Sequence, residues 1–288
     1  MLKVSIGIPI YNEAENIASL FESILIQEGF DFQEIIFVLS GCSDSSEEKI
    51  RQCILKEKRC RLLKQDKREG KASAVNIFLK EASGDILILI SSDVVLDKYC
   101  LSRILTPLQD KRVGMVGGRP IPIKNTSNNL VYIANKIIWD LHHHLALIKP
   151  KLGEVIAFKN IIDKIPCDTA VDEVLLEALI INTGSILCYK SDALIYNKCP
   201  TRIRDLFSQR VRIYWGHIDA LVKTGYKASS MEYKLIFWII LEYAFKRSYL
   251  LFYIIFLCIL ETAVRVMAYY KFYFIRGKLP FIWQKYRK

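Results

Sequence analysis

Short runs of branched apolar residues alternate with amphipathic segments along most of the chain. Strands are expected at residues 3–10, 34–39, 61–64 and 85–90. Several of these runs are almost uninterrupted, which is typical of strands covered on both faces. Periodic apolar positions predict helices over 14–27 and 71–81. The alternation favours an α/β fold in which helices cover both faces of a mostly parallel sheet.

Polar residues predict where some of these elements begin or turn. Asn12, followed by Glu15, resembles a capping box for the first helix. Asp44 is expected to cap the helix that follows the second strand. The stretch GGRP at 117–120 predicts a strand-to-turn bend that brings Arg119 near the cleft described next.

Three of the predicted strands end directly in polar residues, at 9–13, 39–44 and 91–93. Ligands of open α/β sheets bind outside the carboxyl ends of the strands, so these residues are expected to line one cleft. Burial of Asp93 there is costly unless a cation or a hydrogen-bond donor satisfies its carboxylate. A hard divalent ion carrying a diphosphate is a natural partner for it.

Three cations stand on a loop at the same predicted edge, namely Lys67, Arg68 and Lys71. Gly70 permits a tight backbone, and Lys71 stands near a predicted helix N-terminus. Cations and free N–H groups at such a position favour a phosphate.

Six segments resemble, in order and spacing, the motifs of the family 2 glycosyltransferases. They are VSIGIPIYNEAENI, REGKASAVN, GDILILISSDVVLD, VGGRP, DTAVDEVLLEALIINTG and QRVRIYWGH. The resemblance covers about residues 3–225. It implies a GT-A fold, a nucleotide-sugar donor (a UDP- or GDP-sugar), Mg²⁺ or Mn²⁺ as cofactor, and inversion at the anomeric carbon.

The resemblance also assigns a donor site. The end of the first strand would hold the nucleoside, and its matching residues are Pro9, Tyr11, Asn12 and Glu13. Leu39 and Ser40 stand where the family commonly has an acid that reads the base, so the base stays open. Lys71 and Asn76 match the stretch beneath the diphosphate. Asp93 matches the last acid of the metal-binding D-x-D motif, whose first acid is replaced by Ser91.

On the acceptor side, Asp172 and Glu173 match the family's paired acids, one of which is the catalytic base. Their order is reversed here, and alignment through Gly184 favours Glu173 without excluding Asp172. A donor-gripping helix of membrane-bound polysaccharide synthases is matched by Gln209, Arg210 and Arg212. The tryptophan of that motif is Ile213, which argues against processive synthesis. Independently of the resemblance, sugar transfer requires a base for the attacking hydroxyl and a positive charge for the leaving diphosphate.

The segment after residue 234 holds most of the excess apolar residues. LIFWIILEYAF (235–245) is too short to span a bilayer and suits an interfacial helix. YLLFYIIFLCILETAV (249–264), continued by RVMAYYKFYF, is long enough to span if Glu261 and Arg265 form a pair. One span, a shallow hairpin and helices lying on the surface stay open, as does a buried helical pair packed on the catalytic domain.

Charge and cysteine usage narrow the partners. The formal net charge is +11, and residues 271–288 hold six cations and no acid, which favours anionic membrane lipid over nucleic acid. Eight cysteines without a C-x-x-C pair suggest reduced thiols of a cytosol-facing protein, and no signal peptide is expected. The run of histidines at 142–144 lies on a predicted helix, where neighbours point about 100° apart and cannot share one metal ion.

These observations predict a membrane-associated, cytoplasm-facing inverting glycosyltransferase that moves a sugar to a lipid-linked, saccharide or other membrane-proximal acceptor. Residues 1–230 would form the GT-A catalytic domain, with a donor part at 1–122 and an acceptor part at 123–230. Residues 231–288 would form hydrophobic helices with a basic tail. One alternative is a polyprenyl-phosphate sugar synthase. Another, from a different class, is a non-catalytic nucleotide-sugar-binding partner.

Overall fold

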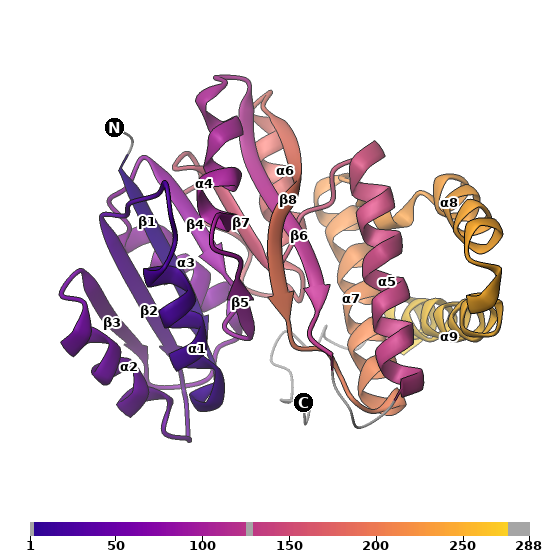
Figure 1. Cartoon of the computed structure of the whole chain (residues 1–288), viewed down its shortest axis with the longest axis horizontal. Coiled ribbons are helices and arrows are strands. Elements are labelled where there is room, and N and C mark those ends of the chain that lie inside the picture. The colour runs from indigo at the N-terminus through magenta and orange to yellow at the C-terminus, as the bar shows by residue number, and fades with distance from the viewer. Residues whose placement is uncertain (1–2, 125–128, 276–288) are drawn as a thin grey trace.

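A computed structural model describes residues 3–124 and 129–275 of the chain (Figure 1). Its strands are β1 (Val4–Ile10), β2 (Glu34–Ser40), β3 (Cys60–Gln65), β4 (Ile86–Ile90), β5 (Val94–Leu96), β6 (Val113–Pro122), β7 (Val155–Lys159) and β8 (Ile186–Asn197). Its α-helices are α1 (Ala14–Leu25), α2 (Ser46–Lys56), α3 (Lys71–Glu81), α4 (Cys100–Leu105), α5 (Asn129–Ile148), α6 (Asp172–Asn182), α7 (Ile203–Thr224), α8 (Tyr233–Lys246) and α9 (Leu251–Tyr270).

The eight strands form one sheet in the order β3-β2-β1-β4-β7-β6-β8-β5. The first four of these strands pair in parallel, as do β6 and β8, whereas β7 runs antiparallel to both of its neighbours and β5 is antiparallel to β8. The predicted α/β class with a largely parallel sheet is therefore confirmed. Because the parallel strands all point the same way, the ends of β1, β2 and β4 meet at one edge.

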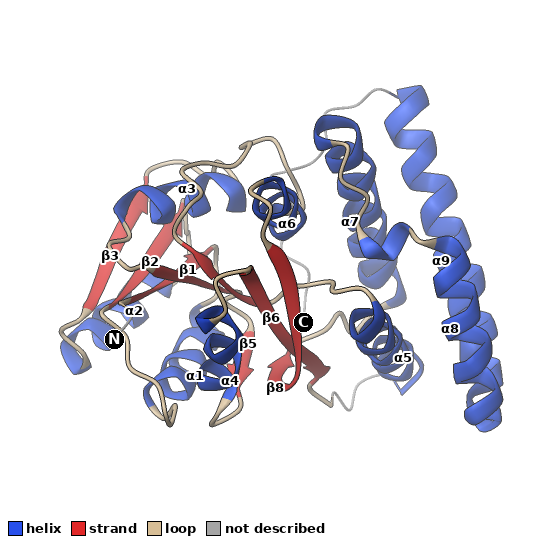
Figure 2. Ribbon diagram, turned by 90° about the horizontal axis from the view of Figure 1, so that it is seen from above, coloured by secondary structure: helices blue, strands red, loops and turns tan. Residues whose placement is uncertain are grey.

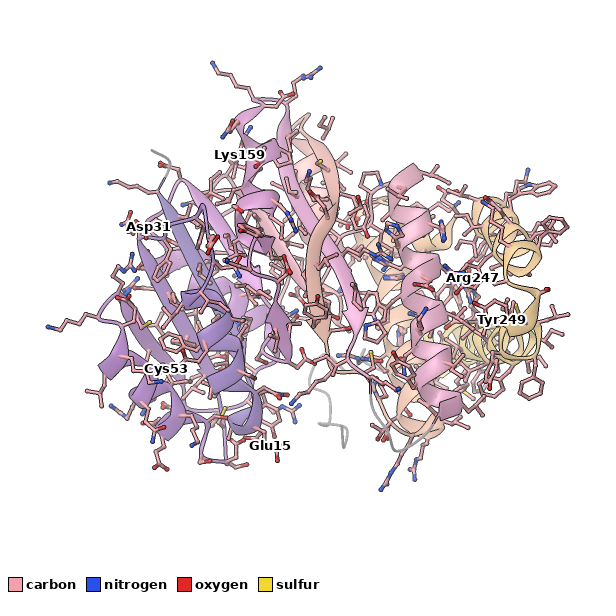
Figure 3. All side chains as sticks on the ribbon, viewed as in Figure 1. Glu15, Asp31, Cys53, Lys159, Arg247 and Tyr249 are labelled. Atoms are coloured by element: carbon pink, nitrogen blue, oxygen red, sulfur yellow. The ribbon has the colours of Figure 1, made fainter. Side chains whose placement is uncertain are left out.

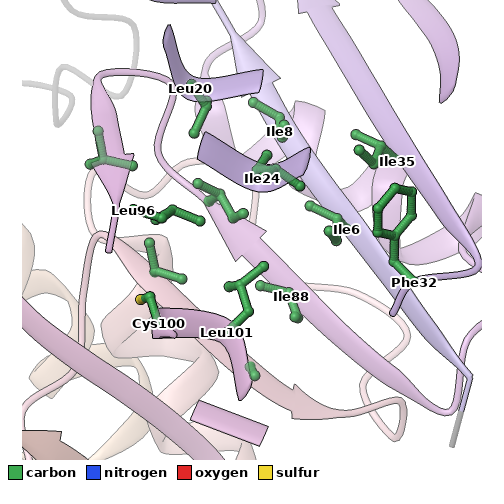
Figure 4. Close-up of a cluster of buried hydrophobic side chains, with 14 of the residues drawn as sticks. Ile6, Ile8, Leu20, Ile24, Phe32, Ile35, Ile88, Leu96, Cys100 and Leu101 are labelled. Atoms are coloured by element: carbon green, nitrogen blue, oxygen red, sulfur yellow. The ribbon is translucent and has the colours of Figure 1, made fainter. Parts of the chain in front are cut away.

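Helices cover both faces of the sheet, as predicted (Figure 2). On one face, Leu20 and Ile24 of α1 and Leu101 of α4 pack with Ile6 and Ile88 (Figure 4). On the other face, α3 and α6 pack on the sheet through a second cluster that includes Phe78, Leu176 and Ile180. At Gly7 of β1 a Cβ atom would lie 2.5 Å from the Phe78 ring, so glycine is what permits this close approach of α3.

The predicted starts of α1 and α2 need correction. The helix α1 begins at Ala14 with Glu13 at the N-cap position, so the capping box of Asn12 and Glu15 is wrong. Asn12 has φ 52° and instead exchanges hydrogen bonds with Ser43, because its Nδ2 donates to Ser43 Oγ and its Oδ1 accepts the Ser43 N–H at 2.8 Å. The N-cap position of α2 is Ser45, so the expected cap at Asp44 is wrong by one residue, although Asp44 still binds the start of the helix. Its carboxylate accepts the Ser46 N–H at the start of α2 and also the Ala14 N–H.

The predicted bend at 117–120 is also wrong, because β6 continues through it to Pro122. What the glycines mark is an irregularity in the register with β8, between Gly117 and Arg119. A Cβ at Gly118 would lie 2.6 Å from the Ala193 carbonyl oxygen, so glycine is required by close packing of β6 against β8.

The helices α5, α7, α8 and α9 form a separate group beside the β6–β8 side of the sheet (Figures 1 and 2). Its apolar contacts include Val211, Tyr214 and Ile218 of α7 with Leu260 and Val264 of α9. Within the described residues one helical segment, Ser248–Ile275, is long and apolar enough to cross a membrane, with a mean hydropathy of 2.2. The expected pairing of Glu261 with Arg265 is present, at 2.7 Å.

Candidate active site

A cavity of about 260 Å³ lies at the carboxyl edge of the parallel strands. Its lining from the first half of the chain is Pro9, Ile10, Tyr11, Glu13, Ser40, Arg68, Gly70, Lys71, Ala74, Ser91, Ser92 and Asp93. Its lining from the second half is Trp139, Lys151, Leu152, Gly153, Glu154, Thr169, Ala170, Val171, Asp172, Glu173, Val174, Pro200, Gln209, Arg212, Ile213 and His217. Most of the residues singled out from the sequence therefore meet on one cavity.

The side of the cavity lined by the first half of the chain is built from loops held face to face. Gly41, directly after β2, has φ 60°, and a Cβ there would lie 2.6 Å from the backbone nitrogen of Arg68. The Arg68 guanidinium lies over the Tyr11 ring, 3.7 Å from its centroid. This contact joins the end of β1 to the loop before α3. The loop turns into α3 at Gly70, whose φ of 92° is accessible mainly to glycine.

Asp93 and Ser91 follow β4 directly. The Ser91 N–H donates to the carbonyl oxygen of Glu154 at 2.8 Å. Glu154 has φ 61°, a conformation uncommon for a non-glycine residue, and strain of this kind concentrates at functional sites. The residues 151–154 are thereby fixed next to the acidic end of β4.

The residues around Asp93 fit a divalent ion that arrives with a nucleotide. The described ranges contain no group of three or more His, Cys, Asp or Glu residues that could hold a metal on its own. Mg²⁺ is usually bound by one or two carboxylates together with waters and substrate phosphates. A single carboxylate at Asp93 with the neighbouring Ser91 hydroxyl meets that requirement, whereas it would not meet that of a closed structural site.

Across the cavity, Lys71 at the start of α3 binds both acids at the start of α6. Its Nζ lies 3.0 Å from Asp172 Oδ2 and 2.5 Å from Glu173 Oε1. Burial and the neighbouring Glu173 charge raise the pKa of Asp172 to about 6. Burial acts the same way on Glu173, but Lys71 outweighs it and lowers the pKa of that carboxyl. The two carboxyls therefore differ in pKa, which is lowered at Glu173 and raised at Asp172.

The three polar residues predicted on α7 separate onto two faces of that helix. Gln209 and Arg212 line the cavity. Arg210 points the other way, where its Nε lies 2.6 Å from Glu261 Oε1 of α9. Residues 209, 212 and 213 share a face at helical spacing, and 210 does not belong to it.

Three further residues lie elsewhere than the sequence suggested. Asn76 is absent from the lining of the cavity. Its amide exchanges hydrogen bonds with the backbone of Ile165, at 2.9 Å to the carbonyl oxygen and 2.8 Å from the N–H. Asn12 supports the cavity indirectly, through its bonds to Ser43. Arg119 is not among the lining residues, so the prediction that places it near the cleft is not supported.

The histidines at 142–144 lie on α5 as expected, outside the cavity lining. His142 is buried, and the ring nitrogen Nδ1 of His143 lies 3.0 Å from the Tyr189 hydroxyl. Sequence reasoning missed other lining residues, above all Lys151, Glu154 and His217. Their position depends on how α5 and α7 dock on the sheet, and no local pattern announces that contact.

The fold and the cavity define an α/β protein of the GT-A type with a two-sided site at the carboxyl edge of the sheet. A family model described as "Glycosyl transferase family 2" matches residues 5–179, and the chain belongs to this family.

Relatives and a solved structure agree with this assignment. "Glycosyltransferase GlyG" of Streptococcus pneumoniae serotype 4 is 26% identical over 129 residues, which are 45% of this chain and 42% of GlyG. A "Dolichol-phosphate mannosyltransferase" of Pyrococcus furiosus is 29% identical over 119 residues, 41% of this chain and 33% of the relative. The matches thus span less than half of these relatives. One similar solved structure is that of the mannosyltransferase PcManGT from Pyrobaculum calidifontis, in complex with GDP-Man and Mn²⁺. It superposes on this chain with a TM-score of 0.72 at 19% identity and covers 96% of this chain and 88% of its own. The likeness shows that the two proteins share a fold.

Proposed function

We propose that the protein transfers a sugar from a nucleotide-sugar donor to a lipid-linked or other membrane-proximal acceptor, with inversion at the anomeric carbon. The observation that carries the proposal is the placement of Asp93 and the pair Asp172 and Glu173 on one cavity, from separate segments of the chain. Asp93 would serve the donor, and one carboxylate of the pair Asp172 and Glu173 would serve the acceptor. A structural role in a helix first turn would not require both to face the same space.

In this proposal the donor lies across the ends of β1, β2 and β4. Tyr11 and Ser40 face the nucleoside, and Arg68 and Lys71 lie toward the diphosphate, where cations favour phosphate. A Mg²⁺ or Mn²⁺ ion held at Asp93 would neutralise charge on the leaving diphosphate. The mannosyltransferase PcManGT, which shares the fold, is described in complex with GDP-Man and Mn²⁺, which supports a donor of this class.

The acceptor hydroxyl attacks the anomeric carbon as the bond from that carbon to the diphosphate oxygen breaks. Its proton passes to Glu173, or to Asp172, so a single carboxylate suffices and no covalent sugar intermediate forms. The electron pair of the breaking bond stays on the diphosphate, where preorganised positive charge stabilises it. Lys71 contacts both acids here, so a donor diphosphate that draws Lys71 away would release the base as the donor binds.

We infer that α8 and α9 attach the protein to a membrane surface. Large apolar side chains lie exposed on both helices, including Phe237, Trp238, Phe245, Phe252 and Ile259. The opposite face of α9 packs on α7, and Glu261 is held there by Arg210. A helix fixed along the catalytic body in this way suits a position in the plane of the interface, with its outer face among the headgroups. We also propose that residues 1–230 form the catalytic part and residues 231–288 the membrane part. The catalytic part would face the cytoplasm.

Hydrolysis of nucleotide sugars tests the enzymatic proposal without knowledge of the acceptor. Purified protein is mixed with UDP- and GDP-sugars, with and without Mn²⁺, and release of nucleoside diphosphate is measured. Slow, metal-dependent release that is lost in Asp93→Ala supports the proposal. Equal release by wild type and Asp93→Ala rejects the metal role, and no release or binding of any donor rejects the enzyme.

Extraction of membranes with carbonate tests attachment, because a surface-bound protein is released and a spanning one is retained.

A further inference from the structure

Lys151 is a cation in the active-site cavity that the proposed chemistry leaves without a task. It lies in the segment between α5 and β7 and is partly buried in the cavity wall. It makes no direct hydrogen bond or ion pair to a residue within 3–124 or 129–275, although the charges of Glu177, Glu173 and Glu154 attract it and that of Arg210 repels it. A lysine withdrawn from water without a directly bound carboxylate carries a desolvation cost that an anionic ligand would offset.

The acids near Lys151 are engaged by other groups. Glu173 binds Lys71. Glu177 is fully buried, and its two oxygens accept the Leu152 N–H at 2.7 Å and the Tyr226 hydroxyl at 3.0 Å. Burial raises the pKa of Glu177 to about 7, which further reduces its negative charge near neutral pH. These acids and Glu154 therefore attract Lys151 only through space, and none of them binds it directly.

The two residues before Lys151 are held in place. Lys149 forms an ion pair with Glu232 at 2.8 Å, and the Ser229 hydroxyl donates to the Pro150 carbonyl at 2.9 Å. Glu232 and Ser229 stand directly before α8, which is the first of the two helices with an exposed apolar face. The lysine is thus preorganised at the end of the cavity that adjoins the proposed membrane helices.

Facing polar groups complete the surroundings. Gln209 and Arg212 of α7 line the same cavity, as does His217. Burial lowers the pKa of His217 well below its usual value, so this imidazole is neutral, and its Nδ1 lies 3.0 Å from the Ser230 hydroxyl. An ammonium, a guanidinium and an amide offer several N–H donors to one tetrahedral anion, which is the arrangement that suits a phosphate group.

We propose that Lys151, together with Gln209 and Arg212, forms a subsite for a phosphate group of the acceptor. The inference rests on the proposed function, because it concerns the acceptor end of the same cavity. It narrows the acceptor to a phosphate ester. The link of residues 149 and 150 to the segment before α8 favours a phosphate carried by a lipid, and a soluble phosphate ester is the other source of the same chemistry.

Binding of three probes to the full chain tests the subsite. Farnesyl phosphate, farnesol and glycerol 3-phosphate are titrated calorimetrically in detergent, with saturating nucleoside diphosphate and Mn²⁺ present to fill the donor side. Wild type is expected to bind farnesyl phosphate about 10-fold to 100-fold more tightly than farnesol, as for a hydrogen bond to a charged group. Lys151→Met should abolish this difference, and Lys151→Arg should retain most of it. Lys149→Met is the matched control, because that lysine lies two residues away and is paired with Glu232.

The probes also identify the source of the phosphate. Tighter binding of farnesyl phosphate than of glycerol 3-phosphate, both dependent on Lys151, supports a lipid acceptor. Equal and Lys151-dependent binding of the two supports a soluble phosphate ester. The subsite is rejected if Lys151→Met still discriminates farnesyl phosphate from farnesol, or if its main defect is in nucleoside diphosphate binding. Lys151→Gln repeats the test should the methionine variant fold poorly, as judged by its melting temperature.

Failure of the subsite and failure of the proposed function give different results. A wild-type protein that hydrolyses a nucleotide sugar but ignores the phosphate of farnesyl phosphate keeps the function and loses the subsite. A protein that discriminates the phosphate through Lys151 but neither binds nor hydrolyses any nucleotide sugar keeps the subsite and loses the function.

Discussion

Two regions of the molecule differ in where their apolar and charged side chains lie. One is the sheet with its covering helices, and the other is the group of α5, α7, α8 and α9. In the sheet, strands such as β1 and β4 are buried along their whole length. In the helical group, Phe245 and Phe252 are 89% and 70% exposed, while ion pairs lie between the helices. Arg210 meets Glu261 at 2.6 Å, and Arg247 meets Asp140 of α5 at 2.7 Å. Figure 3 labels Arg247 among the side chains of this helical group.

This difference separates two roles. A core of buried strands is stabilised by removing apolar surface from water, and it positions the residues that we propose bind the donor at the strand ends. A group of helices that keeps apolar surface outside is suited to a second apolar phase, and contiguous apolar surface of this kind marks an interaction site. The cavity lies where the two regions meet, which fits the proposal that the first region binds a donor and the second contributes to the acceptor end.

The largest expected effect concerns the acids that join the two regions. Glu173→Gln should lower sugar transfer by about 10²-fold to 10⁴-fold, because a general base contributes that range. Donor affinity, measured by calorimetry, should change little. Asp172→Asn is the comparison, and the acid whose loss removes transfer with donor binding intact is the base. Loss of donor binding in both variants would assign the pair a structural role instead.

Two phenylalanines test the contrast directly. Phe78 is fully buried under β1, and Phe78→Ala should lower the free energy of unfolding by about 3–5 kcal/mol. Phe252→Ala, on the exposed face of α9, should change it by less than about 0.5 kcal/mol. The second variant should instead weaken binding to vesicles of anionic lipid in a flotation assay. Unchanged flotation would place the membrane contact elsewhere.

The sequence predicts the sheet better than it predicts the contacts of the helical group. Strands buried on both faces have an unmistakable composition, so the parallel sheet and the start of α3 at Lys71 could be predicted. The partners of Arg210 and Asn76 stand 51 and 89 residues away along the chain, and no local pattern specifies such contacts. Lys151 was missed for the same reason, since it becomes a site residue only when α5 docks beside the sheet.

The ion pair between Arg210 and Glu261 should hold α9 against α7. Glu261→Gln removes the carboxylate that Arg210 shares with Arg265, and removal of one member of a buried pair costs about 3 kcal/mol or more. Hydrogen exchange should therefore accelerate in α9 while β1 and β4 keep their protection. Acceleration throughout the sheet would show that the two regions unfold as one unit. Lys246→Gln provides a surface comparison, because its pair with Glu242 is exposed to solvent and should contribute little to stability.

The smallest expected effect is a gain in stability at the cavity itself. The pKa of Asp172 is raised to about 6, so the folded protein binds a proton there more tightly than the unfolded chain does. By linkage, the stabilisation from this group is complete below the unfolded pKa, near 4, and is lost as pH rises through about 6. At pH 7 the carboxylate is therefore ionised at a cost, and Asp172→Asn should raise the melting temperature there by a few degrees. At pH 4 the gain should vanish, because the wild-type carboxyl is then neutral as well. A gain in melting temperature that persists unchanged at pH 4 would trace the effect to packing. A loss of stability at pH 7 would mean that the contact of Asp172 with Lys71 outweighs the cost of burying the Asp172 charge.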